Sequence, residues 1–385
     1  MNNFDFHNPT RILFGKGRID DLDGQVPADA KVLILFGGGS AERTGVLANV
    51  RKALGDREVV EFSGIEPNPR YETAIKAVDV IAENGVTFIL AVGGGSVIDA
   101  AKFIAAAAKY DGDAWDIFTS FGGVIKDALP FGTVLTLPAT GSEMNTGSVI
   151  THLGKAAKLP FRSPHCAPVF SILDPELTYT LPDRQIANGV ADAFVHVIEQ
   201  YLTYPVGAPV QDGFSETLLR TLIDLGPKAL ETPKDYDIRA SLMWTATLAL
   251  NGLISAGVPQ DWASHMIGHE ITAFNDTDHA RTLAVVLPSL MQDQREAKRE
   301  KLLQYAANVW DIREGDDDAR IDAAIKATVD FFHAMGIDTK LSDYNVGADD
   351  IDTIINALTD HGMTELGEHG KITPTVARRI LEAAL

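Results

Sequence analysis

The sequence predicts an α/β fold: an N-terminal doubly wound parallel sheet over residues 1–178, followed by an all-α C-terminal domain over residues 179–385. Three observations support this prediction. In the first part, apolar runs that end in glycine alternate with helical patterns. From about Leu181 onward, long helical patterns dominate. The length of 385 residues also exceeds what one typical core needs and favours two domains.

The first part of the chain holds the elements of βαβ units. Apolar runs rich in valine, isoleucine and phenylalanine predict buried strands, several of which end in a glycine turn. The expected strands and their turns lie at 31–40, 57–64, 86–96, 131–143 and 168–175. Apolar residues recur at helical spacing between them, which predicts helices over 71–85 and 97–110.

The second part of the chain is expected to be helical throughout. We place the boundary between the two domains near 175–182, in the segment DPELTYTLP. Helical periodicity then predicts helices over 184–203, 211–230, 237–252, 296–310 and 319–336. The chain contains no low-complexity segment and no solenoid repeat.

Composition excludes several classes of partner. Hydrophobic residues make up 45% of the chain and charged residues 22%, as in ordinary globular proteins. The net charge of −20 argues against binding to nucleic acid or to an anionic membrane, both of which require a basic surface. No stretch approaches the roughly 18 uninterrupted apolar residues of a membrane span.

Cysteine usage and the first residues indicate a cytoplasmic protein. Cys166 is the only cysteine, so no disulfide framework can form within the chain and a reducing compartment is expected. The first residues, MNNFDFHNPTRILFG, lack a basic segment followed by an apolar run, and no signal peptide is predicted.

The motif GGGS occurs twice, at 37–40 and 93–96, each time between an expected strand and a helix. Glycine lets backbone N–H groups approach a phosphate closely, and a helix N-terminus adds partial positive charge. Neither copy fits the G-x-G-x-x-G fingerprint or the P-loop. The glycines could simply make tight turns, but two such turns in one doubly wound sheet favour a nucleotide site.

Residues beside the two turns bear on the cofactor. NAD-selective sites place a carboxylate at the end of the first turn, where this chain has Gly39 and Ser40. Arg43 follows three residues later, and a nearby arginine favours the 2′-phosphate of NADP. The alternative is that Arg43 is only a solvated helix residue. After the second turn, Asp99 and Lys102 follow at helical spacing. The helix dipole or a structural pairing would each explain Asp99.

Histidines cluster in the segment 261–285. His265 and His269 are four residues apart and share a helix face, as do Asp192 and His196 further upstream, and His279 follows in a loop. Imidazole and carboxylate ligands together suit Zn²⁺ or Fe²⁺. Such histidines are also found as ordinary packed residues, and no H-E-x-x-H or C-x-x-C pattern is present.

Four segments together resemble one family: GGGSVIDAAK, LPATGSEMN, ADAFVHVIEQ and HMIGHEITAFNDTDHA. They resemble the group III, iron-containing (metal-dependent) alcohol dehydrogenases, and the likeness extends from PTRILFGKG to the last helices. GIEPNPRYET and GVPQDWASHMIGHE resemble the branch of bacterial NADPH-dependent aldehyde reductases and butanol dehydrogenases. The family implies a dinucleotide-binding domain, a helical metal domain and an active site in the cleft between them.

The resemblance assigns roles to individual residues. It implies metal ligands at Asp192, His196, His265 and His279, with one Fe²⁺ or Zn²⁺ ion, and it places His269 near the nicotinamide. Asp99 and His269 are the expected catalytic residues. The residues expected to bind NADP(H) are Gly37, Gly38, Gly39, Ser40, Asn68, Gly94, Gly95, Ser96, Asp99, Thr136, Thr140, Ser142, Asn145 and Lys158. The chain departs from the nearest branch at Glu42, where lysine is usual, and at Leu177, where tyrosine is usual.

The expected function is the metal-assisted reduction of an aldehyde to an alcohol by hydride transfer from NADPH. The resemblance also implies a homodimer. His269 would relay a proton or orient the nicotinamide. The alternatives are an NAD-dependent polyol or glycerol dehydrogenase of the same architecture and a non-catalytic metal-binding protein.

Overall fold

The computed structural model describes residues 1–385, which form two compact units. The α/β unit consists of His7–Leu181 and Lys234–Thr247. The helical unit consists of Met1–Phe6, Pro182–Pro233 and Leu248–Leu385. No helix in either unit has the length and apolar character needed to cross a membrane.

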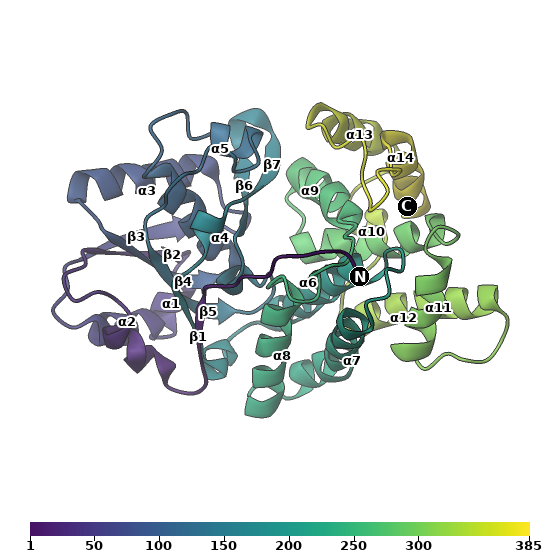
Figure 1. Cartoon of the computed structure of the whole chain (residues 1–385), viewed down its shortest axis with the longest axis horizontal. Helices are drawn as coiled ribbons and strands as arrows, with labels where there is room; N and C mark the ends of the chain where they lie inside the picture. The colour runs from purple at the N-terminus through teal and green to yellow at the C-terminus, as the bar shows by residue number, and fades with distance from the viewer. The chain divides into compact units, whose positions relative to one another are not determined.

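A six-stranded sheet forms the centre of the α/β unit, and every pairing in it is parallel (Figure 1). Its order is β1-β8-β5-β4-β2-β3. The strands are β1 (Arg11–Phe14), β2 (Val32–Gly37), β3 (Val59–Ile65), β4 (Phe88–Gly94), β5 (Phe131–Leu137) and β8 (Phe170–Leu173). The predicted parallel sheet is therefore confirmed.

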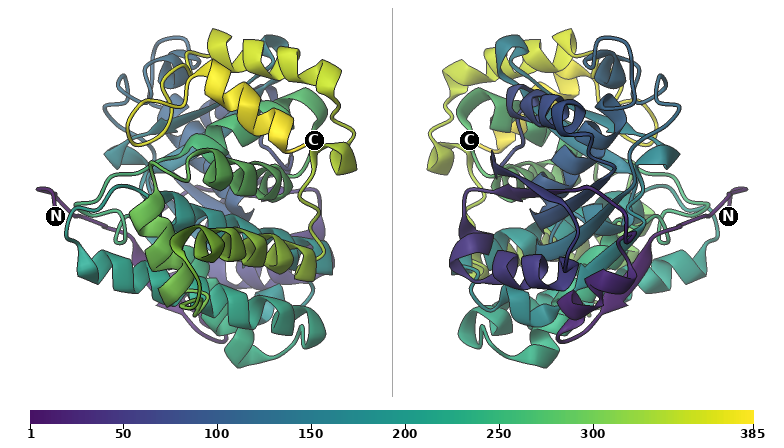
Figure 2. Two further views of the ribbon diagram at one scale, coloured as in Figure 1. Left: turned by 90° about the vertical axis from the view of Figure 1, so that its right-hand side faces the viewer. Right: turned by 90° about the vertical axis from the view of Figure 1, so that its left-hand side faces the viewer.

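Helices cover both faces of this sheet because its strands are apolar on both sides. In β2, Leu33 and Leu35 belong to one buried cluster, while Val32 and Ile34 belong to the other. Helices α3 (Tyr71–Asn84), α4 (Gly95–Ala107) and α5 (Asp116–Thr119) contribute to the first cluster, and α2 (Val46–Leu54) contributes to the second. Figures 1 and 2 show α3 and α2 on opposite sides of the strands.

Some elements of this unit were not predicted from the sequence. Strand β1 has only four residues, and α1 (Ser40–Arg43) is equally short. An antiparallel hairpin, β6 (Gly147–His152) and β7 (Ala157–Arg162), forms a separate two-stranded sheet. Lysine and proline interrupt the apolar pattern of β7, which is tolerated because a two-stranded ribbon has no central strand.

The helical unit contains the second part of the predicted fold. Its helices are α6 (Asp183–Tyr201), α7 (Pro209–Glu231), α9 (Ala263–Asn275), α10 (His279–Asp293), α11 (Arg299–Asn308), α12 (Asp317–Ala334), α13 (Ile351–Asp360) and α14 (Pro374–Ala383). Short 3₁₀ helices occur along the chain: η1 (Arg18–Gly24), η2 (Ser142–Met144), η3 (Leu153–Lys155), η4 (Pro164–Cys166), η5 (Pro175–Thr178), η6 (Leu341–Tyr344) and η7 (Ala348–Asp350). Apolar residues of α9, α10, α13 and α14 form one buried cluster.

The compact units differ from the predicted division at residue 178. Most of helix α8 (Tyr236–Ala249) belongs to the α/β unit, although it lies within the second part of the chain. Met243 is part of the buried cluster on the sheet, and Trp244 packs edge-on against Phe14 with 6.0 Å between ring centroids. Thr247 donates a hydrogen bond of 2.6 Å to Glu143. These tertiary contacts leave no periodic signal in the sequence.

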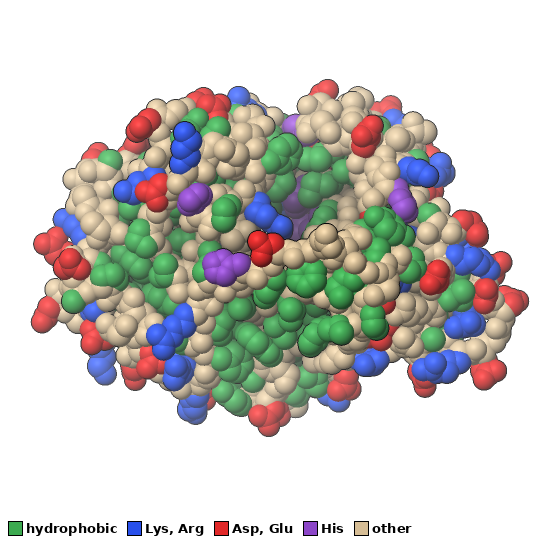
Figure 3. All heavy atoms as spheres, viewed as in Figure 1, with side chains coloured by type: hydrophobic (Ala, Val, Ile, Leu, Met, Phe, Trp, Pro, Cys, Tyr) green, Lys and Arg blue, Asp and Glu red, His purple; other side chains and the backbone are tan.

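Charged side chains are dispersed on the face shown in Figure 3. There, lysine and arginine side chains lie among acidic ones instead of forming one basic patch.

Candidate active site

The two glycine turns lie at the carboxyl ends of neighbouring strands. β2 pairs with β4, and each strand leads directly into its GGGS segment. The chain passes from β2 to β3 on one side and returns to β4 on the other, so the strand order reverses between the two turns. Ligands of doubly wound sheets bind at this switch point. The topology thus brings together two segments that are more than fifty residues apart in sequence.

Gly39 and Gly95 are glycines for different physical reasons. Gly39 has φ of 95°, a backbone conformation that strains any other residue. A Cβ atom at Gly95 would lie 2.4 Å from Oγ1 of Thr140, so a side chain there would clash. Gly95 begins α4, and no side chain caps the first turn of this helix. The backbone N–H groups of that turn therefore remain available to a phosphate.

At the first glycine turn, the guanidinium group of Arg43 is the positive charge nearest to Gly39. Nη1 of Arg43 lies 3.3 Å from the place where a Cβ on Gly39 would be. Glu42 turns to Arg51, with 3.0 Å between its Oε2 and Nη2, and Arg51 also binds Glu61 at 2.5 Å. The negative charge of Glu42 is therefore balanced by Arg51, and Arg43 stays exposed and available.

Three predicted cofactor residues take part in a buried polar network around Lys102. Nζ of Lys102 donates to Oγ of Ser142 at 2.8 Å and to Oδ1 of Asn145 at 2.7 Å. Ser142 in turn donates to Asp99 at 2.5 Å, and the second carboxylate oxygen of Asp99 accepts from the backbone N–H of Val149. Asp99 and Lys102 are therefore linked through Ser142. The network fixes the loop after β5 against α4.

Burial shifts the ionisation of this network. Lys102 is fully buried, and burial lowers the pKa of its ammonium group to about 8. Burial also raises the pKa of the Asp99 carboxyl, against the opposing effect of Lys102 and Ser142. Since both oxygens of Asp99 already accept hydrogen bonds, its contacts are structural, and its predicted catalytic role stays a prediction.

Asn68 and Lys158 come together although ninety residues separate them. Nζ of Lys158, on β7, donates to Oδ1 of Asn68 at 2.9 Å. Lys158 is buried, and Asn68 has a positive φ of 54° in the turn after β3. Thr136 lies near the end of β5, the strand next to β4. The predicted cofactor residues of the α/β unit thus lie at or shortly after the carboxyl ends of β2, β3, β4 and β5, including the start of α4, and on the hairpin.

Three of the four predicted metal ligands form a group in the helical unit. Asp192 on α6, His265 on α9 and His279 at the start of α10 offer ligand atoms that all lie within 4.8 Å of one another. Asp192 Oδ1 is 4.0 Å from Nε2 of His265 and 3.8 Å from Nε2 of His279. One carboxylate and neutral imidazoles are donors that suit Zn²⁺ and Fe²⁺, so the group fits the expected ion.

His196, the fourth predicted ligand, lies beside this group. Its ring stacks on His265 with 4.6 Å between centroids, and its Nδ1 is 3.7 Å from Oδ1 of Asp192. Burial lowers the pKa of His196 to about 4, so its ring is neutral at neutral pH and could act as a ligand. Its place in the ligand set stays a prediction.

The structure corrects the predicted position of His279. His279 was expected in a loop, but it is the first residue of α10. Asp278, directly before it, binds Arg184 and Asn188 of α6 at 2.7 Å each, which holds the start of α10 against α6. His269 is buried one turn after His265, and its ring centroid lies 5.0 Å from that of His279.

Glu199 was not among the site residues predicted from the sequence. Its carboxylate contacts Nδ1 of His265 and accepts a hydrogen bond from the backbone N–H of Ser264 at 2.5 Å. A signal for it existed, because Glu199 lies in the quoted segment ADAFVHVIEQ, seven residues after Asp192 and three after His196. Those spacings place all three on one face of a helix.

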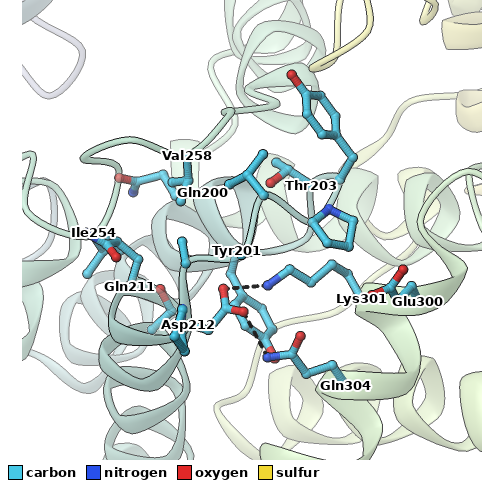
Figure 4. A pocket seen from close by; sticks show the side chains of 17 residues that line it. Gln200, Tyr201, Thr203, Gln211, Asp212, Ile254, Val258, Glu300, Lys301 and Gln304 are labelled. Atoms are coloured by element: carbon cyan, nitrogen blue, oxygen red, sulfur yellow. Dashed lines mark hydrogen bonds and ion pairs between the residues drawn. The ribbon is translucent and has the colours of Figure 1, made fainter. Parts of the chain in front are cut away.

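A separate cavity of about 210 Å³ in the helical unit contains none of these residues (Figure 4). Lys301 lies in its wall, 2.5 Å from Asp212 and over the ring of Tyr201 at 4.4 Å from the centroid. Gln304 also donates to Asp212, at 3.1 Å. Lys301 and Asp212 therefore balance each other, and the cavity holds none of the predicted site residues.

Comparison with known proteins identifies the family. Residues 9–175 match the model of iron-containing alcohol dehydrogenases, and residues 186–383 match the C-terminal model of the same family. The chain is 59% identical to the NADPH-dependent aldehyde reductase YqhD of Escherichia coli K12 over 100% of both chains. It is 41% identical to a probable NADH-dependent butanol dehydrogenase of Bacillus subtilis, also over 100% of both.

Solved structures agree with these matches. The crystal structure of E. coli YqhD superposes with a TM-score of 0.99 at 58% identity, covering 100% of this chain and 99% of that one. The structure of NADH-dependent butanol dehydrogenase A from Thermotoga maritima superposes with a TM-score of 0.96 at 35% identity, with the same coverage. The chain therefore belongs to the iron-containing alcohol dehydrogenase family.

Proposed function

We propose that this oxidoreductase reduces aldehydes to primary alcohols with NADPH, reversibly, and that it uses one divalent metal ion. The observation that carries the proposal is the 59% identity to an NADPH-dependent aldehyde reductase over the whole chain. The grouping of Asp192, His265 and His279 adds support, since these donors suit a divalent ion.

Each unit would contribute separate chemistry. When bound, the ion supplies Lewis acidity that polarises a carbonyl group, and the nicotinamide supplies a hydride. Asp192, His196, His265 and His279 would hold the ion. The glycine turns and the first turn of α4 would bind the phosphates, and Lys158 with Asn68 would position the nicotinamide ribose. His269 would pass a proton to the alcohol oxygen.

Steady-state rates with NADPH and NADH on short and medium aldehydes test the function. The assay should be run on the protein as purified, after chelation, and after Zn²⁺ or Fe²⁺ is restored. We expect NADPH-dependent turnover that disappears on chelation and returns with the ion. Turnover that survives complete metal removal would contradict the metal part. A preference for NADH and polyols would instead identify the NAD-dependent polyol dehydrogenase.

The proposed preference for NADP(H) rests on Arg43. Arg43 is exposed, lies beside Gly39 and forms no ion pair with an acidic side chain. Arg51, by contrast, forms ion pairs with Glu42 and Glu61. A guanidinium group recognises phosphate oxygens through charge-assisted hydrogen bonds. The E. coli reductase named above is also called NADPH-dependent.

Arg43→Ala should shift the cofactor preference toward NADH. The ratio of kcat/KM for NADPH to that for NADH should fall at least about 10-fold, or about 1.4 kcal/mol, because NADH lacks the phosphate that Arg43 would bind. Gly39→Asp is a poorer test, since φ of 95° strains any side chain there. The matched control is Lys52→Ala, which removes an exposed cation of α2. An unchanged ratio in Arg43→Ala would refute the placement of the 2′-phosphate.

We also propose a cytoplasmic homodimer. Strand β1 is an edge of the sheet, and Phe14, Val169 and Trp244 of the α/β unit are exposed apolar residues at or near it. A sheet edge with exposed aromatic residues favours association with a second chain. The single cysteine, Cys166, is buried and suits a reducing compartment. Light scattering should give twice the chain mass of 41.5 kDa.

A further inference from the structure

Glu199 lies on the ligand-bearing face of α6. Asp192, His196 and Glu199 follow one another at intervals of four and three residues, so they form one stripe along the helix. Glu199 is 3% exposed. A carboxylate buried this deeply requires partners for both of its oxygens.

Both oxygens of Glu199 face the first turn of α9. Oε1 accepts from the backbone N–H of Ser264 at 2.5 Å, and Oε2 contacts Nδ1 of His265. A histidine whose Nδ1–H donates to a carboxylate keeps Nε2 free of its proton and able to bind a metal. Nε2 is the atom that His265 turns toward Asp192, 4.0 Å away.

A buried lysine, Lys298, links the C-terminal end of α6 to the segment that precedes α9. The backbone N–H of Asp261 donates to the carbonyl oxygen of Glu199 at 2.9 Å, and Oδ1 of Asp261 accepts from the backbone N–H of Ala263 at 2.9 Å. Oδ2 of Asp261 lies 2.6 Å from Nζ of Lys298. Lys298 also binds Glu368 at 2.7 Å and the carbonyl oxygen of Leu202 at 2.7 Å. The start of α9 is thus fixed by several contacts that converge on α6.

We propose that Glu199 is a positioning residue of the metal site, which fixes the tautomer and orientation of His265 so that Nε2 is presented to the ion. The proposal rests on the proposed function, since it presupposes that the group around Asp192 binds metal. Carboxylate groups behind metal-binding histidines orient the ring and strengthen the ligand.

Glu199→Gln tests the proposal with almost no change of size. An amide has an NH₂ donor where the carboxylate has its second oxygen, so in the same orientation either Ser264 N–H or His265 Nδ1–H faces a donor instead of an acceptor. We expect the dissociation constant for Zn²⁺ or Co²⁺, measured by chelator competition on the full chain, to rise about 10- to 100-fold. The visible absorption bands of the Co²⁺ protein should also shift, because the ligand field of His265 changes.

Glu270→Gln is the matched control. Glu270 is also a buried carboxylate of the helical unit, and its Oε1 lies 2.9 Å from Nδ1 of His361, which is outside the metal group. The same chemical change there should leave the metal dissociation constant and the Co²⁺ spectrum as in the unmodified protein. A loss of metal affinity equal to that of Glu199→Gln would show a general effect of removing a buried charge and would overturn the proposal.

The outcomes separate this proposal from the function on which it rests. If the unmodified protein binds no divalent ion, the metal mechanism itself fails. If it binds the ion and Glu199→Gln binds it equally well with the same Co²⁺ spectrum, only the role of Glu199 fails.

A measurement on the unmodified protein covers the case in which Glu199→Gln does not fold. In the Zn²⁺ form labelled with ¹⁵N at histidine, the His265 ring should show a protonated Nδ1, assigned through the resonance lost in His265→Ala. An Nδ1 without a proton would overturn the proposal.

Discussion

Replacing His279 by alanine should abolish aldehyde reduction while the protein still folds. His279 is one of three grouped ligand residues, so its loss leaves the ion weakly held, and several kcal/mol of Lewis-acid stabilisation disappears with it. The rate should fall by roughly 10³-fold or more. The side chain of His279 is 23% exposed, against 6% for His265, so this variant disturbs packing less than His265→Ala.

Metal content by mass spectrometry and steady-state rates on the same preparation check this result. His333→Ala is the control, because His333 is an exposed histidine of α12 far along the chain from the ligand residues. It should keep both the ion and the rate. Full activity in a metal-free His279→Ala protein would refute the proposed metal mechanism.

His269→Ala should keep most of the metal and lose most of the turnover. His269 lies one turn after His265 on α9, with its ring 5.0 Å from that of His279, but it is not a member of the ligand group. If it transfers a proton to the alcohol oxygen, kcat should fall by roughly 10²- to 10⁴-fold, the usual range for a lost general acid. Added imidazole should then restore part of the rate.

The same measurements distinguish the other roles of His269. A ligand role would lower metal content as far as in His279→Ala. A packing role would leave both kcat and metal content near those of the unmodified protein, and a purely orienting role would lower kcat without rescue by imidazole. Metal loss or an unchanged kcat would each contradict the assignment of His269 as proton donor.

Much of the fold could be predicted from local sequence. The glycine-terminated apolar runs became β2 and β4, and α3, α4 and α6 lie within two residues of the predicted bounds at most of their ends. These elements are long and strongly periodic, and burial on both sheet faces leaves a clear signal. Strand β1 and the hairpin β6–β7 were missed because four- to six-residue elements with mixed composition carry little periodicity.

The candidate ligand residues could also be named from sequence, because their helical spacings are local. Asp192 with His196, and His265 with His269, are pairs four residues apart. Spacing along the chain could not predict which of these pairs come together in the fold. It also could not predict that His279 begins a helix instead of lying in a loop. The grouping of Asp192, His265 and His279 depends on the packing of α6, α9 and α10.

By itself, the sequence determined the α/β and helical parts, the two glycine turns and the residue types of the candidate metal site, since each depends on neighbours along the chain. Tertiary structure alone decided that α8 packs with the sheet, that Glu42 is neutralised by Arg51, and that Glu199 reaches His265. The physical reason is that hydrogen bonds and ion pairs depend on distances of a few ångströms between segments far apart in sequence, and only the folded chain sets those distances.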